Sequence, residues 1–156
     1  MQKITPCLWF DTQAEEAARF YVSIFKNSKI GDISRYGDAG PGPKGGVLVV
    51  VFELDGVRFT ALNGGPVFKF NEAISLQVDC ADQAEVDDMW DRLSAGGQTS
   101  QCGWLKDRYG VSWQIVPRIL MELIGDPDPA KSQRVMAAML KMTKIDIAKL
   151  QEAYAG

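Results

Sequence analysis

Apolar and polar residues alternate near the start of the chain, which predicts a half-buried strand with Ile4, Leu8 and Phe10 on one side. The spacing then becomes helical, and Thr12 followed by Glu15 is typical of a capping box at a helix start. The apolar face of this predicted helix consists of Ala14, Ala17, Ala18, Tyr21, Ile24 and Phe25. The first elements are therefore a strand and an amphipathic helix.

Three further strands are predicted before residue 64. Their ranges are 29–36, 46–54 and 57–63. Asp55-Gly56 between the last two is a strong signal for a tight hairpin turn. Residues 37–46 are rich in glycine and proline, which predicts a mobile hairpin loop. A lid over a binding site is the less favoured interpretation of this loop.

An internal repeat follows, because Gln13-Ala14-Glu15 recurs as Gln83-Ala84-Glu85. At the same offset Ile4 corresponds to Ile74 and Phe20 to Trp90. The second strand should carry its apolar set, Ile74, Leu76 and Val78, beneath a helix capped by Asp82. Strands are expected near 98–104 and 111–117, so the second copy is one strand short unless the segment around Asn71 or Cys102 supplies it.

Beyond Pro117 the pattern becomes helical, with a break at Asp126-Pro127-Asp128-Pro129. We therefore predict an α+β fold in which two βαβββ modules form a cupped mixed sheet, followed by a C-terminal helical tail. The modules are assigned to residues 1–70 and 71–117, and the tail to 118–156. The apolar stripes of the tail could cover the outside of the sheet or a second subunit.

Composition narrows the possible functions. The 156 residues have a formal net charge of −3 and no basic patch, so a nucleic-acid partner is not expected. Neither a signal segment nor a membrane span is evident, which predicts a cytoplasmic protein without a membrane partner. Cys7, Cys80 and Cys102 lie far apart, which is typical of buried small hydrophobes rather than of disulfides or a zinc site.

The side of each strand opposite its apolar set is unusually polar. In the first copy this side carries Thr5, Cys7 and Trp9, and in the second Ser75, Gln77 and Asp79. The last strands of the copies align as Gly-Val-x-aromatic-polar, so Thr60 corresponds to Gln114. An amide in a buried strand requires hydrogen-bond partners, and this polar face is therefore the candidate site. By contrast, Lys106-Asp107-Arg108 is expected to be a solvated turn.

The sequence resembles the PhnB-like branch of the vicinal-oxygen-chelate superfamily, often named demethylubiquinone methyltransferases. The resemblance is carried by Leu8 to Asp11, Ala14 to Ala17, Phe20-Tyr21, Asn71 to Ala73, Ser75-Leu76, the run CGWLKDRYGVSWQIVP from Cys102 to Pro117, and Lys144 to Ile147. It implies paired βαβββ modules, commonly in homodimers. In metal-using relatives, His and Glu on the first and last strands hold a divalent ion. The corresponding positions here are Thr5 or Cys7, Thr60, Ala73 or Ser75, and Gln114.

These residues do not predict a metal centre, because the chain contains no histidine and has a neutral Gln114 where metal-using relatives have Glu. No cofactor is predicted, since a Gly-rich turn between a strand and a helix is missing. We expect a metal-free protein that binds a small-molecule ligand in the cup, as a homodimer. The alternatives are an enzyme of the superfamily, either demethylubiquinone 3-methyltransferase or glyoxalase-like, and a ligand-free dimeric scaffold. The predicted ligand-binding residues are Thr5, Cys7, Trp9, Thr60, Ser75, Gln77 and Gln114.

Overall fold

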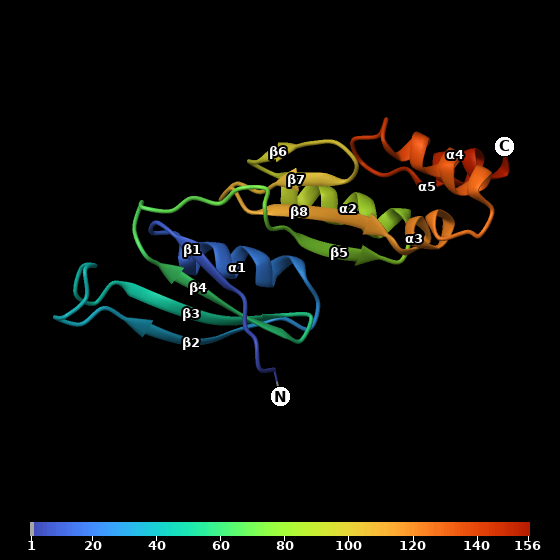
Figure 1. Ribbon diagram of the computed structural model, residues 1–156. Helices are drawn as coiled ribbons and strands as arrows, with labels where there is room; N and C mark the ends of the chain where they lie inside the picture. Colours follow the sequence, from blue (N-terminus) through green and yellow to red (C-terminus); the bar gives the residue numbers. More distant parts are fainter. Residues whose placement is uncertain (1) are drawn as a thin grey trace. The chain divides into compact units, whose positions relative to one another are not determined.

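One helix covers one face of a four-stranded mixed sheet in the first of two units (Figure 1). The computed structural model describes residues 2–156 and divides after Phe70. The elements of the first unit are β1 (Cys7–Phe10), α1 (Ala14–Ile24), β2 (Lys29–Arg35), β3 (Val47–Leu54) and β4 (Val57–Asn63). The strand order is β1-β4-β3-β2, with β1 parallel to β4 and the other pairs antiparallel. This is the predicted βαβββ arrangement.

The second unit repeats this topology, with strand order β5-β8-β7-β6. Its elements are β5 (Leu76–Cys80), α2 (Gln83–Ser94), β6 (Gln98–Thr99), β7 (Trp104–Lys106) and β8 (Ser112–Pro117). The single strand predicted near 98–104 is in fact a short hairpin, because Cys102 and Gly103 have φ angles of 59° and 82° and reverse the chain. The segment around Cys102 therefore provides the strand that the second copy lacked in the sequence analysis. The predicted α+β fold is confirmed.

The apolar side of each sheet lies beneath its helix. In the first unit α1 packs against β3 and β4, and Tyr21 and Phe52 are fully buried there. The placement of Ile4 and Ile74 beneath the helices was wrong, because they are 83% and 68% exposed. Both residues precede the first strand of their unit.

The two helices begin differently, although the sequence predicted equivalent caps. The capping box from Thr12 and Glu15 was wrong: Gln13 is the N-cap without a side-chain cap bond, and Glu15 pairs with Arg19 instead. The Ala14 amide donates to Asn63 Oδ1 at 2.8 Å, so a side chain from β4 replaces the local cap. In α2 the predicted cap is confirmed, because Asp82 Oδ1 accepts from the Glu85 amide at 2.9 Å.

Two turns of the first unit follow from glycine geometry. Asp55 and Gly56 both have positive φ, 49° and 77°, as a tight two-residue hairpin turn requires, which confirms that prediction. The β2–β3 loop packs on the ring of Tyr36. A Cβ on Gly42 would lie 2.3 Å from that ring, so only glycine allows this approach. The Tyr36 hydroxyl also donates to the Asn63 carbonyl oxygen, which fastens the loop to the end of β4.

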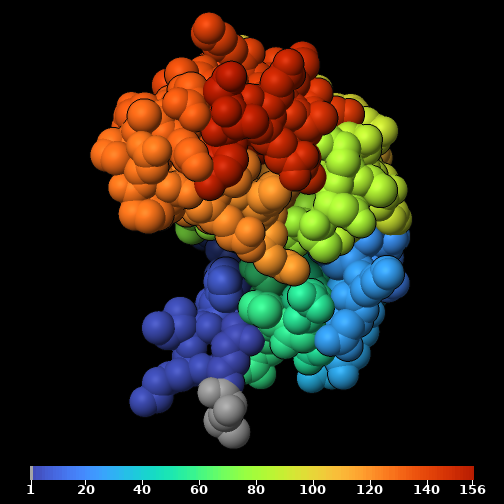
Figure 2. All heavy atoms as spheres, turned by 90° about the vertical axis from the view of Figure 1, so that its right-hand side faces the viewer, coloured from blue at the N-terminus to red at the C-terminus, as the bar shows by residue number. Residues whose placement is uncertain are grey.

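The tail forms α3 (Arg118–Ile124), α4 (Pro129–Met139) and α5 (Ile147–Ala155), with the predicted break between α3 and α4. Its orange-to-red residues form one continuous surface in Figure 2. The helices share a small core that also contacts Val116 of β8; its buried members are Leu120, Val135, Met142, Ile145 and Leu150. The side chain of Gln83 joins α2 to the tail, donating to the Ile145 carbonyl at 3.0 Å and accepting from the Ile147 amide at 2.8 Å. The tail is therefore packed into the second unit.

Within residues 2–156, none of the helices has the length and apolar character needed to cross a membrane.

We predict that Asn63→Ala lowers the free energy of unfolding by about 1–2 kcal/mol, because it removes the cap of α1 and a hydrogen bond to the Val47 carbonyl. Urea denaturation measures the change. Gln13→Ala is the matched control and should change stability by less than about 0.5 kcal/mol, since Gln13 is exposed and makes no side-chain cap bond. An equal loss in both variants would contradict the role of Asn63.

Candidate functional site

The parallel pairing of β1 with β4 brings two predicted site residues together in the first unit. Cys7 lies directly beside Thr60 in the strand register, and the thiol of Cys7 is exposed. Thr60 also lies opposite Val51 of β3, on the face away from α1. Thr5 precedes β1 and is half-buried. On this side of the first sheet, Cys7 and Thr60 therefore lie next to each other, with Val51 beside Thr60.

Trp9 has a defined packing role in the same unit. Its indole N–H donates to the Gly65 carbonyl at 2.9 Å, and Phe68 meets its ring edge-on with 5.0 Å between ring centroids. A Cβ on Gly64 would come within 2.3 Å of the indole, so the ring lies directly on the glycine backbone. The polar atom of Trp9 is thus already bonded within the unit, and a ligand contact through its ring stays a prediction.

Three predicted site residues come together in the second unit and are called the polar patch: Ser75, Gln77 and Gln114. Gln77 lies beside Gln114 in the parallel β5–β8 register. Gln114 Nε2 donates to Ser75 Oγ at 2.8 Å, and Trp104 of β7 lies on the other side of Gln114. The amide expected to need partners has therefore found one, and Gln77 is exposed beside it.

Ser112 and Lys106 belong to the same sheet face and were missed by the sequence analysis. Ser112 is two residues before Gln114, so both side chains point to one side of β8, and Lys106 is its direct partner on β7. Ser112 is 2% exposed, and its hydroxyl has no hydrogen-bond partner among residues 2–156. Such a group costs about 1–3 kcal/mol when unsatisfied. Strand alternation could have found Ser112 in the sequence, because a residue two positions before Gln114 lies on the same face of the strand.

Lys106 forms an ion pair with Glu72, which precedes β5. The hydrogen bond from Lys106, together with its charge, lowers the pKa of the Glu72 carboxyl. Because both side chains are substantially exposed, this pair is worth little in stability. Its two groups are therefore free to exchange partners.

Asp107 is a structural residue, and its interpretation as part of a solvated turn was wrong. The residue is 3% exposed. Its carboxylate accepts from the amides of Tyr109 and Val111 at 2.9 and 3.0 Å, and from Trp113 Nε1 at 2.9 Å. Three donors converge on one carboxylate and replace its water, which is why the charge can be buried.

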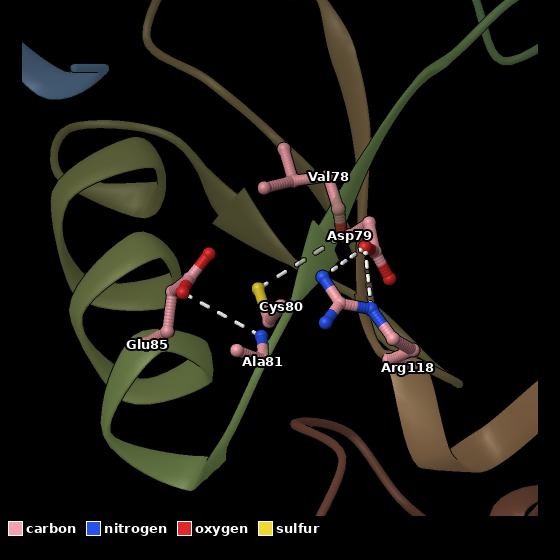
Figure 3. Close-up of polar contacts among 6 residues, drawn as sticks. All are labelled: Val78, Asp79, Cys80, Ala81, Glu85 and Arg118. Atoms are coloured by element: carbon pink, nitrogen blue, oxygen red, sulfur yellow. Dashed lines mark hydrogen bonds and ion pairs between the residues drawn. The ribbon is translucent and has the colours of Figure 1, made fainter. Parts of the chain in front are cut away.

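Figure 3 shows why Asp79 and Cys80 are unsuited to catalysis. Arg118 donates to Asp79 Oδ2 from Nε at 3.0 Å and from Nη2 at 2.7 Å, which raises the pKa of Arg118 and occupies the carboxylate. Cys80 is buried beside this pair and close to Glu85. Burial, reinforced by the nearby carboxylates, raises the pKa of the Cys80 thiol to about 12. The expectation that all three cysteines are buried was wrong for Cys7 and holds for Cys80.

The donor chemistry does not fit the divalent metal found in some relatives. Divalent ions prefer imidazole, thiolate or carboxylate ligands, and the expected metal positions offer one cysteine together with only hydroxyls and an amide. Among residues 2–156, His, Cys, Asp and Glu side chains form no group of three or more that could hold a metal ion.

Comparison with known proteins identifies the family. Residues 2–116 match the sequence model of the family described as 3-demethylubiquinone-9 3-methyltransferase. The chain belongs to this family. Its PhnB-like relative from Bacillus cereus, a putative 3-demethylubiquinone-9 3-methyltransferase, is 39% identical, with a TM-score of 0.69 over 74% of this chain and 99% of that one. The predicted membership of the PhnB-like branch of the vicinal-oxygen-chelate superfamily is confirmed.

More distant structures share the fold of this PhnB-like protein. Protein PA1353 from Pseudomonas aeruginosa is 20% identical, with a TM-score of 0.62 over 75% of this chain and 98% of that one. The fosfomycin resistance protein FosX from Listeria monocytogenes is 14% identical, with a TM-score of 0.57 over 78% and 94% of the two chains. No curated protein sequence matches this chain. The tail beyond residue 116 lies outside the range matched by the family.

We predict that a thiol-reactive dye at pH 8 labels Cys7 quickly in the native protein and leaves Cys80 unmodified. The thiolate is the reactive form, and with a pKa of about 12 only about one Cys80 thiol in ten thousand is ionised at that pH. Mass spectrometry of labelled peptides measures both sites. Cys7→Ser should remove the fast phase and Cys80→Ser should not; rapid labelling of Cys80 without unfolding would contradict the prediction.

Proposed function

We propose that this protein binds a small organic molecule without a metal, on the sheet face opposite each helix. The observation that carries the proposal is the polar patch, where Gln114 lies between Gln77 and Trp104 in the strand register and donates a hydrogen bond to Ser75. Neutral donors and acceptors beside an aromatic ring suit recognition of a small polar ligand. Thr5, Cys7, Trp9 and Thr60 are the proposed contacts in the first unit.

Binding is favoured over catalysis because the carboxylates near this face are poorly suited to act as general bases. Glu72 and Asp79 lie in exposed ion pairs, and the neighbouring Lys106 lowers the pKa of Glu72. Asp107 is buried and accepts hydrogen bonds from two amides of its turn and from Trp113 of β8. The chain also has no histidine to serve as a general base near neutral pH. The family description names a methyltransferase. That activity is the second candidate, and it rests on the description of the family.

We also propose that the protein is a cytoplasmic homodimer. Val67 and Phe68 are 73% and 63% exposed on the segment after β4, and a second copy would remove these large apolar side chains from water. Three free cysteines suit a reducing compartment. Light scattering after size exclusion measures the mass, and a dimer that Phe68→Ser converts to a monomer is the expected result. A wild-type monomer at micromolar concentration would contradict this proposal.

The ligand is sought by a thermal-shift screen against small metabolites and drugs, with divalent metals and a methyl donor included. A ligand at 100 times its Kd stabilises the native state by about 2.7 kcal/mol, which is readily measured as a higher Tm. Gln114→Ala should weaken a specific hit by about tenfold, because it removes the central amide of the patch. We predict no such response to the metals.

The matched control is Gln101→Ala, which removes an exposed amide from the β6–β7 turn and should leave the affinity unchanged. Equal losses in both variants would place the ligand elsewhere. A specific shift with Zn²⁺, Mn²⁺ or Ni²⁺ would overturn the metal-free proposal. Methyl transfer to a quinone precursor, monitored by mass spectrometry, would favour the second candidate.

A further inference from the structure

The buried hydroxyl of Ser112 is the feature that the fold itself leaves unexplained. The side chain is 2% exposed, and its oxygen neither donates nor accepts a hydrogen bond within residues 2–156. Buried polar groups in native proteins almost always have a partner, whether in the protein, in ordered water or in a ligand. Ser112 lies on the same face of β8 as Gln114 of the polar patch, so a ligand bound at that patch is a natural partner.

A cation lies next to this hydroxyl. Lys106 is the direct cross-strand partner of Ser112 on the antiparallel β7–β8 pair, which places their Cβ atoms about 4.5–5.5 Å apart. The Lys106 ammonium is currently paired with Glu72. A hydroxyl without a partner and a lysine held by an exposed carboxylate are thus neighbours on one face. Together they can provide two adjacent donors to one oxyanion.

The Glu72 carboxylate occupies the position beside the Lys106 ammonium that an oxyanion of a bound ligand could take. Its pairing with Lys106 is between two exposed groups, 59% and 40% accessible, and such pairs add little to stability. An incoming oxyanion can therefore replace Glu72 at small cost. The oxyanion would also accept a hydrogen bond from Ser112, which Glu72 does not.

We propose that the ligand of this face carries an oxyanion, a carboxylate or a phosphate group, that displaces Glu72 from Lys106 and accepts a hydrogen bond from Ser112. The proposal rests on the proposed function and specifies its ligand class. The rest of the ligand then extends toward Trp104 and the polar patch, since Gln114 is the next residue on the same face of β8.

The test uses three probes with one phenyl ring: benzoate, phenyl phosphate and neutral benzamide. Isothermal titration or ligand-observed NMR on the full chain measures their Kd values. We expect one of the two anions to bind about tenfold more tightly than benzamide. Whether benzoate or phenyl phosphate is preferred distinguishes a carboxylate from a phosphate ligand.

Three variants assign the contacts. Lys106→Gln should weaken the binding of the preferred anion by about tenfold, and Ser112→Ala should weaken it by about threefold to tenfold. Glu72→Gln should tighten binding by about twofold to fivefold, because it removes the competing carboxylate. Ser112→Ala should leave the Tm of the free protein unchanged or raised, since it deletes a buried group without a partner.

Lys29→Gln and Glu53→Gln are the controls, because these residues form a comparable cross-strand pair in the first unit and should not affect binding. The inference would be overturned if Glu72→Gln weakened anion binding. It would also be overturned if Lys106→Gln bound the anion as tightly as the wild-type protein. Failure of both anions to bind at millimolar concentration would also overturn it. The proposed function would still hold after either result if Gln114→Ala weakened the binding of a neutral ligand. It would fail if Gln114→Ala weakened the binding of no ligand.

Discussion

Parallel pairing of the first strand with the last strand of each unit brings Cys7 next to Thr60 and Gln77 next to Gln114. Without it, Cys7 and Thr60, or Gln77 and Gln114, would be separated by a helix and two further strands. Parallel neighbours require a long crossover, and in both units the helix belongs to that connection. The helix covers one face of the sheet, so the other face is left to carry polar side chains.

On that open face the second unit carries two exposed ion pairs, Lys106–Glu72 and Arg118–Asp79, together with neutral polar side chains. Its centre is the neutral Ser75–Gln114 hydrogen bond, and the nearby Asp107 carboxylate is stabilised by hydrogen bonds from two backbone amides and the Trp113 indole. Lys106 and Glu72 hold the only charges we assign to the recognition step. A surface of this kind can recognise a ligand through hydrogen bonds and one charge, while proton transfer would need a free base.

The two units show how a duplicated pattern can be stabilised by different contacts. In α2 the local Asp82 side chain caps the helix, as its sequence position indicates. In α1 the cap comes from Asn63, at the far end of the module, although Thr12 is correctly spaced for it. Residue spacing along the chain predicted the Asp82 cap and missed the Asn63 cap, because strand pairing brings the Asn63 oxygen to the start of α1.

The sequence by itself determined the repeat, the apolar helix faces, the Asp55-Gly56 turn and the strands that carry Thr60 and Gln114. These features depend on periodicity and on short-range backbone geometry, which neighbouring residues dictate. Only the tertiary structure decided that Asp107 is buried, that Ser112 lacks a partner and that Lys106 holds Glu72. Burial and pairing of polar groups depend on contacts between segments far apart in the chain, and no local pattern specifies them.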